Sequence, residues 1–373
     1  MAIKVAHIAV VAPHRAGLYE SARELVAAQR AVGIDARVVD PSPSEEEFPR
    51  FIEDAKRRGE ENVVKAFLKP PPKDWQETRE PKPAPLEFAL QADILVSHSG
   101  LVRQSLIKAA KPVVEVIHGR PRVCFLYEYL GEQTIYTYYR QIANDPMRRA
   151  FVHFWPEYQP YWKMIFPEHR LRVINPSVDL DFWTPGPKEY DFQGQGGQIN
   201  VVCTDRTRND KDIYHQMHAF AIFAQRHPQA RLHVCGLEGN RRGFSVLLDV
   251  LRERGVLGQV LPTVIGLEHI YRAADLVLTP HKIAVRTVCE ALACGCQLVA
   301  PSGNRFTSYT ADEEDPCAFA DAMERAWQDC QQDRTARVQA NRETAVREFN
   351  PATAATAWRK LFEEILAGGP AAG

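Results

Sequence analysis

The chain has 373 residues, of which 45% are hydrophobic and 25% are charged, and its formal net charge is −1. This length and composition predict two globular domains, each able to bury a core, and exclude a disordered chain. A net charge close to zero also argues against a global basic field for nucleic acid, while leaving room for a local basic patch.

The cysteines and the apolar start of the chain indicate a cytoplasmic protein without a membrane span. The eight cysteines are scattered, with no paired CxxC and no regular disulfide spacing. Cys294 and Cys296 are a weak metal signal, and buried thiols in a reducing compartment explain them better. Met1–Pro13 is too short to cross a bilayer and lacks a signal-peptide cleavage site, so we expect a buried first strand there.

Short apolar runs alternate with amphipathic segments, a pattern typical of βαβ units around parallel sheets. In the first half, strands are predicted at 5–12, 36–39, 94–96, 113–117 and 151–154, with a helix over 18–32. Residues 41–85, dense in proline and charge, are predicted to leave the sheet, with a short helix near Glu45–Arg58.

A second alternating series begins after the glycine-rich segment Gly194–Gly197. Its predicted strands are 200–204, 231–235, 260–265, 276–279 and 297–300, and its predicted helices are 213–226, 242–254, 269–273, 286–293 and 316–332. The predicted fold is therefore α/β, with two doubly wound Rossmann-like domains facing across a cleft. We expect an N-terminal domain at 1–180, a linker at 181–198, a C-terminal domain at 199–345, and a helix at 346–366 that returns to the N-terminal domain. In such folds ligands bind outside the carboxyl ends of the strands.

Arg206 and Lys211 follow the first predicted strand of the C-terminal domain. At that position a guanidinium and an ammonium group suit a diphosphate, and fixed cations would stabilise the negative charge that builds up on a leaving phosphate. The alternative is a solvated charged loop, because Asp205 and Asp210 lie beside the two cations.

Glu290 lies inside a helix predicted to begin near Val285, with its positive end toward the expected cleft. Two interpretations are open for its carboxylate. It could form an ion pair with Arg286, four residues earlier on the same helix, or it could accept the two hydroxyls of a ribose.

These segments together resemble the large retaining GT-B glycosyltransferase family, glycosyltransferase group 1, which includes glycogen, sucrose and lipopolysaccharide enzymes. The matching elements are Asn175–Asp179, Arg206 with Lys211, Leu232–Gly236, Tyr271-x-x-Ala274-Asp275 with Pro280, and Glu290–Gly295 with Val299-Ala300. The resemblance covers most of residues 150–345, and the combination of motifs is more specific than any one of them.

The resemblance implies that a hexose such as glucose is transferred, with retention, from a nucleotide-diphosphate donor such as UDP-glucose to a hydroxyl acceptor. It implies a catalytic role for His118, Arg206 and Lys211. The donor-binding residues that it implies are Gly17, Arg206, Lys211, Gly236, Ile265, Lys282 and Glu290. Lys282 stands where the family has a glutamate close to the donor sugar, so a noncatalytic nucleotide-sugar-binding module is the alternative of another class.

The N-terminal domain is expected to receive the acceptor, through His14, Arg15, His98, Arg120 and Arg122. An aromatic-rich stretch from Tyr127 to Trp162 suits either stacking on sugars and bases or an ordinary core. Together with the basic cluster Lys56–Arg58, it supports a second function, glycosylation of hydroxymethylated bases such as 5-hydroxymethylcytosine in viral DNA, which would act in the cytoplasm of a host cell.

Neither a metal nor a cofactor is expected. Asp179-Leu180-Asp181 resembles the Asp-x-Asp metal motif of the other glycosyltransferase fold, but it lies in the interdomain element, and no other cluster has ligand spacing. Arg206 and Lys211 would supply the positive charge instead.

Overall fold

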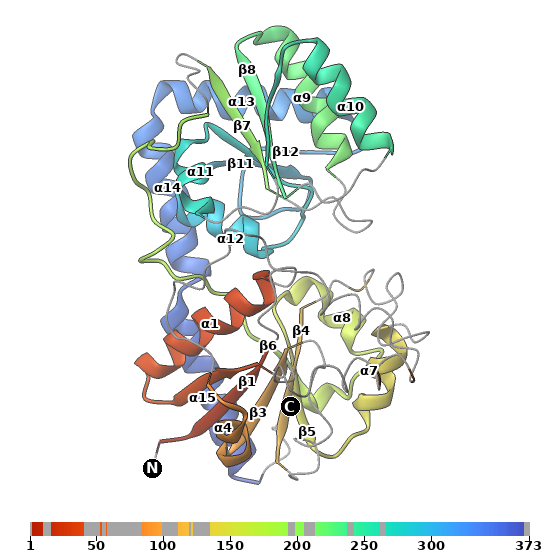
Figure 1. Ribbon diagram of the computed structural model, residues 1–373, viewed down its shortest axis with the longest axis vertical. Coiled ribbons are helices and arrows are strands. Elements are labelled where there is room, and N and C mark those ends of the chain that lie inside the picture. Colours follow the sequence, from red (N-terminus) through yellow and green to blue (C-terminus); the bar gives the residue numbers. More distant parts are fainter. Residues whose placement is uncertain are drawn as a thin grey trace. The chain divides into compact units, whose positions relative to one another are not determined.

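Two parallel β-sheets of six strands each form the framework of the chain (Figure 1). The computed structural model describes residues 2–9, 16–40, 53, 57, 84–98, 111–118, 121, 135–192, 198–204, 213–236, 242–261 and 266–368. The chain forms an N-terminal unit, Met1–Ser177 with Pro351–Gly373, and a C-terminal unit, Val178–Asn350. The predicted α/β class with two doubly wound domains is confirmed.

The sheet of the N-terminal unit has the strand order β2-β1-β3-β4-β5-β6. Its strands are β1 (Lys4–Ile8), β2 (Asp35–Val39), β3 (Ile94–His98), β4 (Val113–Ile117), β5 (Arg148–His153) and β6 (Leu171–Val173). Its helices are α1 (Ala16–Ala31), α4 (Leu86–Gln91), α7 (Ile135–Ala143), α8 (Gln159–Trp162) and α15 (Pro351–Leu366). The short helix predicted near Glu45–Arg58 lies outside the described residues, apart from positions 53 and 57.

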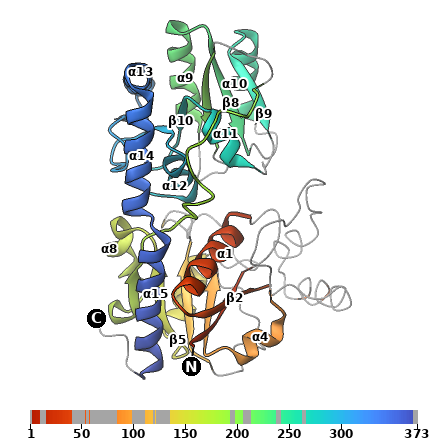
Figure 2. The same ribbon diagram turned by 90° about the vertical axis from the view of Figure 1, so that its left-hand side faces the viewer.

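The two faces of this sheet follow the alternation of side chains along its strands. Val5 and Ala9 of the first strand segment pack under α1 and α15, whereas Ala6 and Ile8 pack against α4. Helix α15 lies beside α1, so the last helix of the chain completes the core of the N-terminal unit (Figure 2).

Most of the described residues in the predicted aromatic-rich stretch form core rather than a binding surface. Tyr139 and Trp162 are buried with Phe151 and Phe166, and the rings of Phe151 and Phe166 stack with centroids 4.2 Å apart. The core interpretation of these residues therefore holds, because an apolar ring between a sheet and two helices is removed from water.

The sheet of the C-terminal unit has the strand order β12-β11-β10-β7-β8-β9. Its strands are β7 (Ile199–Cys203), β8 (Ala230–Cys235), β9 (Leu257–Leu261), β10 (Leu276–Leu278), β11 (Gln297–Pro301) and β12 (Thr310–Ala311). Its helices are α9 (Tyr214–Arg226), α10 (Arg242–Glu253), α11 (Leu267–Ala273), α12 (Arg286–Ala293), α13 (Pro316–Gln332) and α14 (Arg334–Glu348). Side chains of α9, α10 and α13 share its largest core cluster with the sheet.

Several strands begin earlier than predicted, and the shift is three residues at β5 and at β9. Strand β9 starts at Leu257, whereas the apolar run had placed it at 260–265, of which 262–265 lie outside the described residues. The backbone N–H of Gln259 donates to Nδ1 of His233 at 3.0 Å, and a side chain at Gly258 would collide with that ring. Contacts to the neighbouring strand, rather than hydrophobicity, thus set the start of β9.

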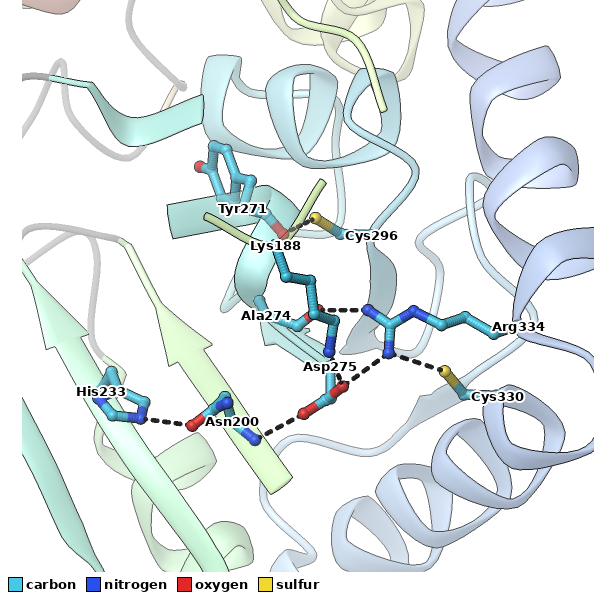
Figure 3. A network of polar contacts seen from close by, with 9 residues as sticks. All are labelled: Lys188, Asn200, His233, Tyr271, Ala274, Asp275, Cys296, Cys330 and Arg334. Atoms are coloured by element: carbon cyan, nitrogen blue, oxygen red, sulfur yellow. Dashed lines mark hydrogen bonds and ion pairs between the residues drawn. The ribbon is translucent and has the colours of Figure 1, made fainter. Parts of the chain in front are cut away.

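Asp275 holds the amino ends of the central strands β7 and β10 (Figure 3). One carboxylate oxygen accepts from Lys188 Nζ at 2.6 Å and from Arg334 Nη1 at 2.7 Å, and the other accepts from the N–H of Asn200 at 2.8 Å. Asp275 is only 5% exposed, so its charge depends on these donors. The Asp of the Tyr-x-x-Ala-Asp motif therefore has a structural role at the edge opposite the carboxyl ends of the strands.

We predict that Asp275→Asn lowers the free energy of unfolding of the C-terminal unit by about 2–3 kcal/mol, because it removes a buried charge from three donors. Urea unfolding followed by circular dichroism measures the change. The matched control is Asp321→Asn, which breaks an exposed pair with Arg226 and should have a clearly smaller effect, because solvent screens an exposed ion pair. Equal effects of the two substitutions would contradict the structural role of Asp275.

Candidate functional site

The winding direction of each sheet changes beside its first strand. In the C-terminal unit the chain runs from β7 outward through β8 to β9 and then crosses back to β10 on the other side of β7. Loops that leave β7 and β10 therefore part in opposite directions at their carboxyl ends, which is where open α/β sheets bind ligands. The described residues at this edge are Thr204 after β7 and 279–285 between β10 and α12.

Tyr271 of α11 connects the loops of this edge. Its hydroxyl lies 3.0 Å from Oγ1 of Thr204, which follows β7, and it donates to the carbonyl oxygen of Thr287 in the first turn of α12 at 3.3 Å. The tyrosine is fully buried. A single side chain thus fixes the end of β7 relative to the start of α12.

Helix α12 begins at this edge without a side-chain cap at Val285. The amino end of a helix carries partial positive charge and backbone donors that suit an anion such as a phosphate. The helix follows β10 closely because the residues of 279–285 other than Lys282 are buried, and Asn304 donates to the carbonyl oxygen of His281 at 2.9 Å.

The side chain of Glu290 pairs with Arg286 on the same helix. Arg286 Nε lies 2.5 Å from Glu290 Oε1, and the guanidinium lies 5.9 Å from the centre of the Trp183 ring. The ion pair proposed from the spacing is present, and Glu290 is only 4% exposed. The predicted binding of a ribose by Glu290 stays a prediction.

Two further residues predicted to bind the donor lie at loops of the same sheet. The side chain of Lys282 is 54% exposed, and its Nζ lies 3.3 Å from Oε1 of Glu313. The aliphatic part of this side chain passes close to Gly303, which follows β11. Gly236 directly follows β8 with a φ of 80°, a conformation that favours glycine, and its N–H donates to the carbonyl oxygen of Leu261 at 2.9 Å.

Several predicted site residues cannot be placed. The residues that lie outside the described part of the chain are His14, Arg15, Lys56, Arg58, Arg120, Arg122, Arg206, Lys211 and Ile265. Gly17 is the second residue of α1. Arg57 pairs with Glu53 at 3.3 Å, with both side chains well exposed. The predicted diphosphate and acceptor contacts of this group stay predictions.

Asp179, the first residue of the Asp-Leu-Asp segment, serves the local backbone. Its Oδ1 accepts from the N–H groups of Asp181 and Phe182, each at 3.1 Å. Within the described residues, no group of three or more His, Cys, Asp or Glu side chains is placed to hold a metal ion. Likewise, none of the described helices combines the length and hydrophobicity that a membrane span requires.

In the N-terminal unit the predicted histidines lie together. The switch of winding lies between β1 and β3, and His98 ends β3 while His118 follows β4. His98 Nδ1 lies 2.8 Å from His118 Nε2, and His98 Nε2 lies 3.0 Å from His7 Nδ1. His7 in turn contacts Gln29 of α1, with 2.9 Å between Nε2 and Oε1.

Sequence reasoning missed His7 and Gln29. The signal was present, since His7 lies two residues after the inward-facing Val5 and Gln29 lies three and four residues after the apolar Val26 and Leu25 of α1. A polar residue that falls on the otherwise apolar, buried face of a strand or helix is the signal that would have pointed to them.

Comparison with known proteins agrees with this architecture. Residues 198–329 match the family Glycosyl transferases group 1. No curated protein sequence matches the chain. The family match and the two-domain fold define the class of protein: the chain is a glycosyltransferase of GT-B fold.

Solved structures with this fold cover almost the whole chain. HepE from Anabaena, crystallised with UDP-glucose, is 15% identical, with 97% of this chain and 100% of HepE covered and a TM-score of 0.66. Sucrose-phosphate synthase from Thermosynechococcus elongatus is 15% identical, with coverages of 98% and 99% and a TM-score of 0.64. A glycosyltransferase from Rickettsia africae is 11% identical, with coverages of 99% and 100% and a TM-score of 0.63.

The two interpretations of Glu290 predict different responses to substitution. We expect Glu290→Gln to weaken UDP binding by about tenfold or more, because a charge-assisted hydrogen bond to the ribose is worth about 1.5–3 kcal/mol. Isothermal titration calorimetry with UDP measures the change. Glu324→Gln, which alters a partly buried carboxylate paired with His227, is the matched control and should leave binding unchanged.

Arg286→Gln separates the ion pair from the ligand contact. If Glu290 serves only its pair with Arg286, both substitutions will lower stability and neither will change the affinity for UDP. That outcome would remove Glu290 from the donor site.

Proposed function

We propose that the chain transfers a hexose, with glucose as the first candidate, from a UDP-sugar to a hydroxyl acceptor, with retention of the anomeric configuration. The observation that carries the proposal is the arrangement of residues at the carboxyl ends of β7 and β10. There Tyr271 fixes the end of β7 against α12, the helix begins without a side-chain cap, and the buried Glu290 follows within that helix.

The chemistry of this edge suits a nucleotide-diphosphate donor. The start of α12 offers positive potential to a diphosphate, and Arg206 and Lys211 follow β7 directly in the sequence. Glu290 would hold the ribose. The structure of HepE with UDP-glucose supports a UDP-hexose as the donor to test first.

Retention is supported by the resemblance to retaining enzymes, and the lowered pKa of His118 argues against this histidine as the general base of an inverting transfer. An inverting transfer needs a general base to take the proton of the acceptor, and such a base works best with a pKa near the working pH. Burial lowers the pKa of His118 to about 3, which makes its imidazole a weak base. A neutral His118 suits hydrogen bonding to a sugar better than proton abstraction.

We expect the purified full chain to release UDP from UDP-glucose slowly without acceptor. Substitution of both Arg206 and Lys211 by Ala should lower this rate by about 10²-fold or more, because each cation stabilises charge on the leaving diphosphate. The matched control replaces Arg252 and Arg254, two exposed residues at the end of α10, by Ala. An assay for released UDP measures all three proteins.

Other outcomes separate the alternatives. Near-normal turnover in the Arg206/Lys211 variant would overturn the assignment of the diphosphate site. Tight UDP binding without turnover of any UDP-sugar in a panel would favour the noncatalytic binding module. With an acceptor identified, the proton coupling of the new anomeric centre in NMR shows whether configuration is retained.

A further inference from the structure

Residues 180–184 form a short turn segment of the C-terminal unit, which we call the anchored turn. Arg272 of α11 and Arg342 of α14 each donate to two of its backbone carbonyl oxygens. The four bonds are 2.6 to 3.3 Å long and reach Leu180, Phe182, Trp183 and Thr184. Arginine presents its donors in a rigid fork, so the backbone on both sides of Trp183 is fixed in place.

The side chain of Trp183 contacts two residues of the candidate donor site. Its indole is 4% exposed and packs edge-on to the ring of Tyr271, with centroids 6.1 Å apart. The guanidinium carbon of Arg286, the first residue of α12, lies 5.9 Å from the centre of the indole ring. This distance falls within the range, up to about 6 Å, in which a cation is attracted to the face of an aromatic ring.

Arg286 compensates the charge of a buried carboxylate. Its Nε lies 2.5 Å from Oε1 of Glu290, one turn further along α12, and only 18% of the Arg286 side chain and 5% of that of Glu290 are exposed. A buried charge requires a partner in good geometry, whereas a long arginine side chain can adopt many rotamers. An aromatic ring beside the guanidinium stabilises those rotamers that keep the cation close to both the ring and Glu290.

We propose that Trp183 is a positioning residue of the donor site: its indole holds Arg286 against Glu290 and so fixes the orientation in which the carboxylate meets the ribose. This inference rests on the proposed function for the ligand of Glu290. The effect of Trp183 on the ion pair itself requires no ligand. If Trp183 instead only fills apolar space, its loss will lower stability without changing the Arg286–Glu290 contact or the affinity for UDP.

Two substitutions of Trp183 and a matched control separate these roles. Trp183→Leu keeps an apolar side chain but removes the aromatic ring, and we expect it to weaken UDP binding by about fivefold, the size of one partly desolvated cation–π contact. Trp183→Phe keeps a ring and should stay within about twofold of the wild type. Trp327→Leu, at a partly buried tryptophan that packs on the core of the same unit, should lower stability and leave the affinity for UDP unchanged.

A double substitution tests the route through Arg286. Arg286→Gln alone should weaken UDP binding at least as much as Trp183→Leu does. In that background the cation is absent, so Trp183→Leu should change the Kd for UDP by less than about twofold further. Isothermal titration calorimetry of the full chain with UDP measures each variant. An equal effect of Trp183→Leu in both backgrounds would overturn the role of Arg286 as the group through which Trp183 acts.

Crystal structures of the variants without nucleotide give a readout that does not depend on the ligand. We expect the guanidinium of Arg286 to leave Glu290 in Trp183→Leu and to keep this contact in Trp183→Phe and in Trp327→Leu. An Arg286–Glu290 pair that is unchanged in Trp183→Leu would overturn the proposal.

The outcomes also distinguish this inference from the proposed function. If Glu290→Gln weakens UDP binding and Trp183→Leu does not, the positioning role is overturned and the donor site stands. If the wild-type chain binds no UDP, the proposed function and the link of Trp183 to a donor site both fail, while the structures without nucleotide still decide whether Trp183 holds the ion pair.

Discussion

The winding of each parallel sheet around its first strand is the constraint on which the rest of the structure depends. Parallel strands require crossovers, and a change of winding direction leaves the loops after two neighbouring strands free to part. In the N-terminal unit these strands are β1 and β3, and in the C-terminal unit they are β7 and β10. In each unit, the described candidate binding residues lie at or near these carboxyl ends, where loop side chains and the starts of helices come together.

In the C-terminal unit, contacts at the amino ends of the central strands stabilise the fold, and contacts at their carboxyl ends shape the candidate binding site. At the amino ends, Asp275 joins the segment before the sheet, the strand β7 and helix α14 through Lys188, Asn200 and Arg334. At the carboxyl ends, Tyr271 sets the approach of α12. Tyr271 and Asp275 both belong to the Tyr-x-x-Ala-Asp motif. A short sequence motif of this kind can therefore mark residues that stabilise the framework of a site as well as residues that bind a ligand.

The sequence predicted five of the six strands of each sheet and most helices, because apolar periodicity records which face of an element is buried. It missed the short strands β6 and β12. It also placed His98 and His118 at strand ends, and it anticipated the pair of Arg286 and Glu290 from their spacing. It failed where position depends on contacts between distant elements: β9 starts early because Gly258 and Gln259 fit His233. The contacts that join Gln29, His7, His98 and His118 were missed for the same reason, since strand register brings these residues together and single-sequence patterns do not specify register.

A crystal structure of the full chain with UDP tests the central claim most directly. The account predicts the nucleoside at the carboxyl ends of β7 and β10, with a ribose hydroxyl within hydrogen-bond distance of Glu290 and the diphosphate at the start of α12. UDP bound away from this edge, with the carboxylate of Glu290 paired with Arg286 and out of reach of the ribose, would contradict it.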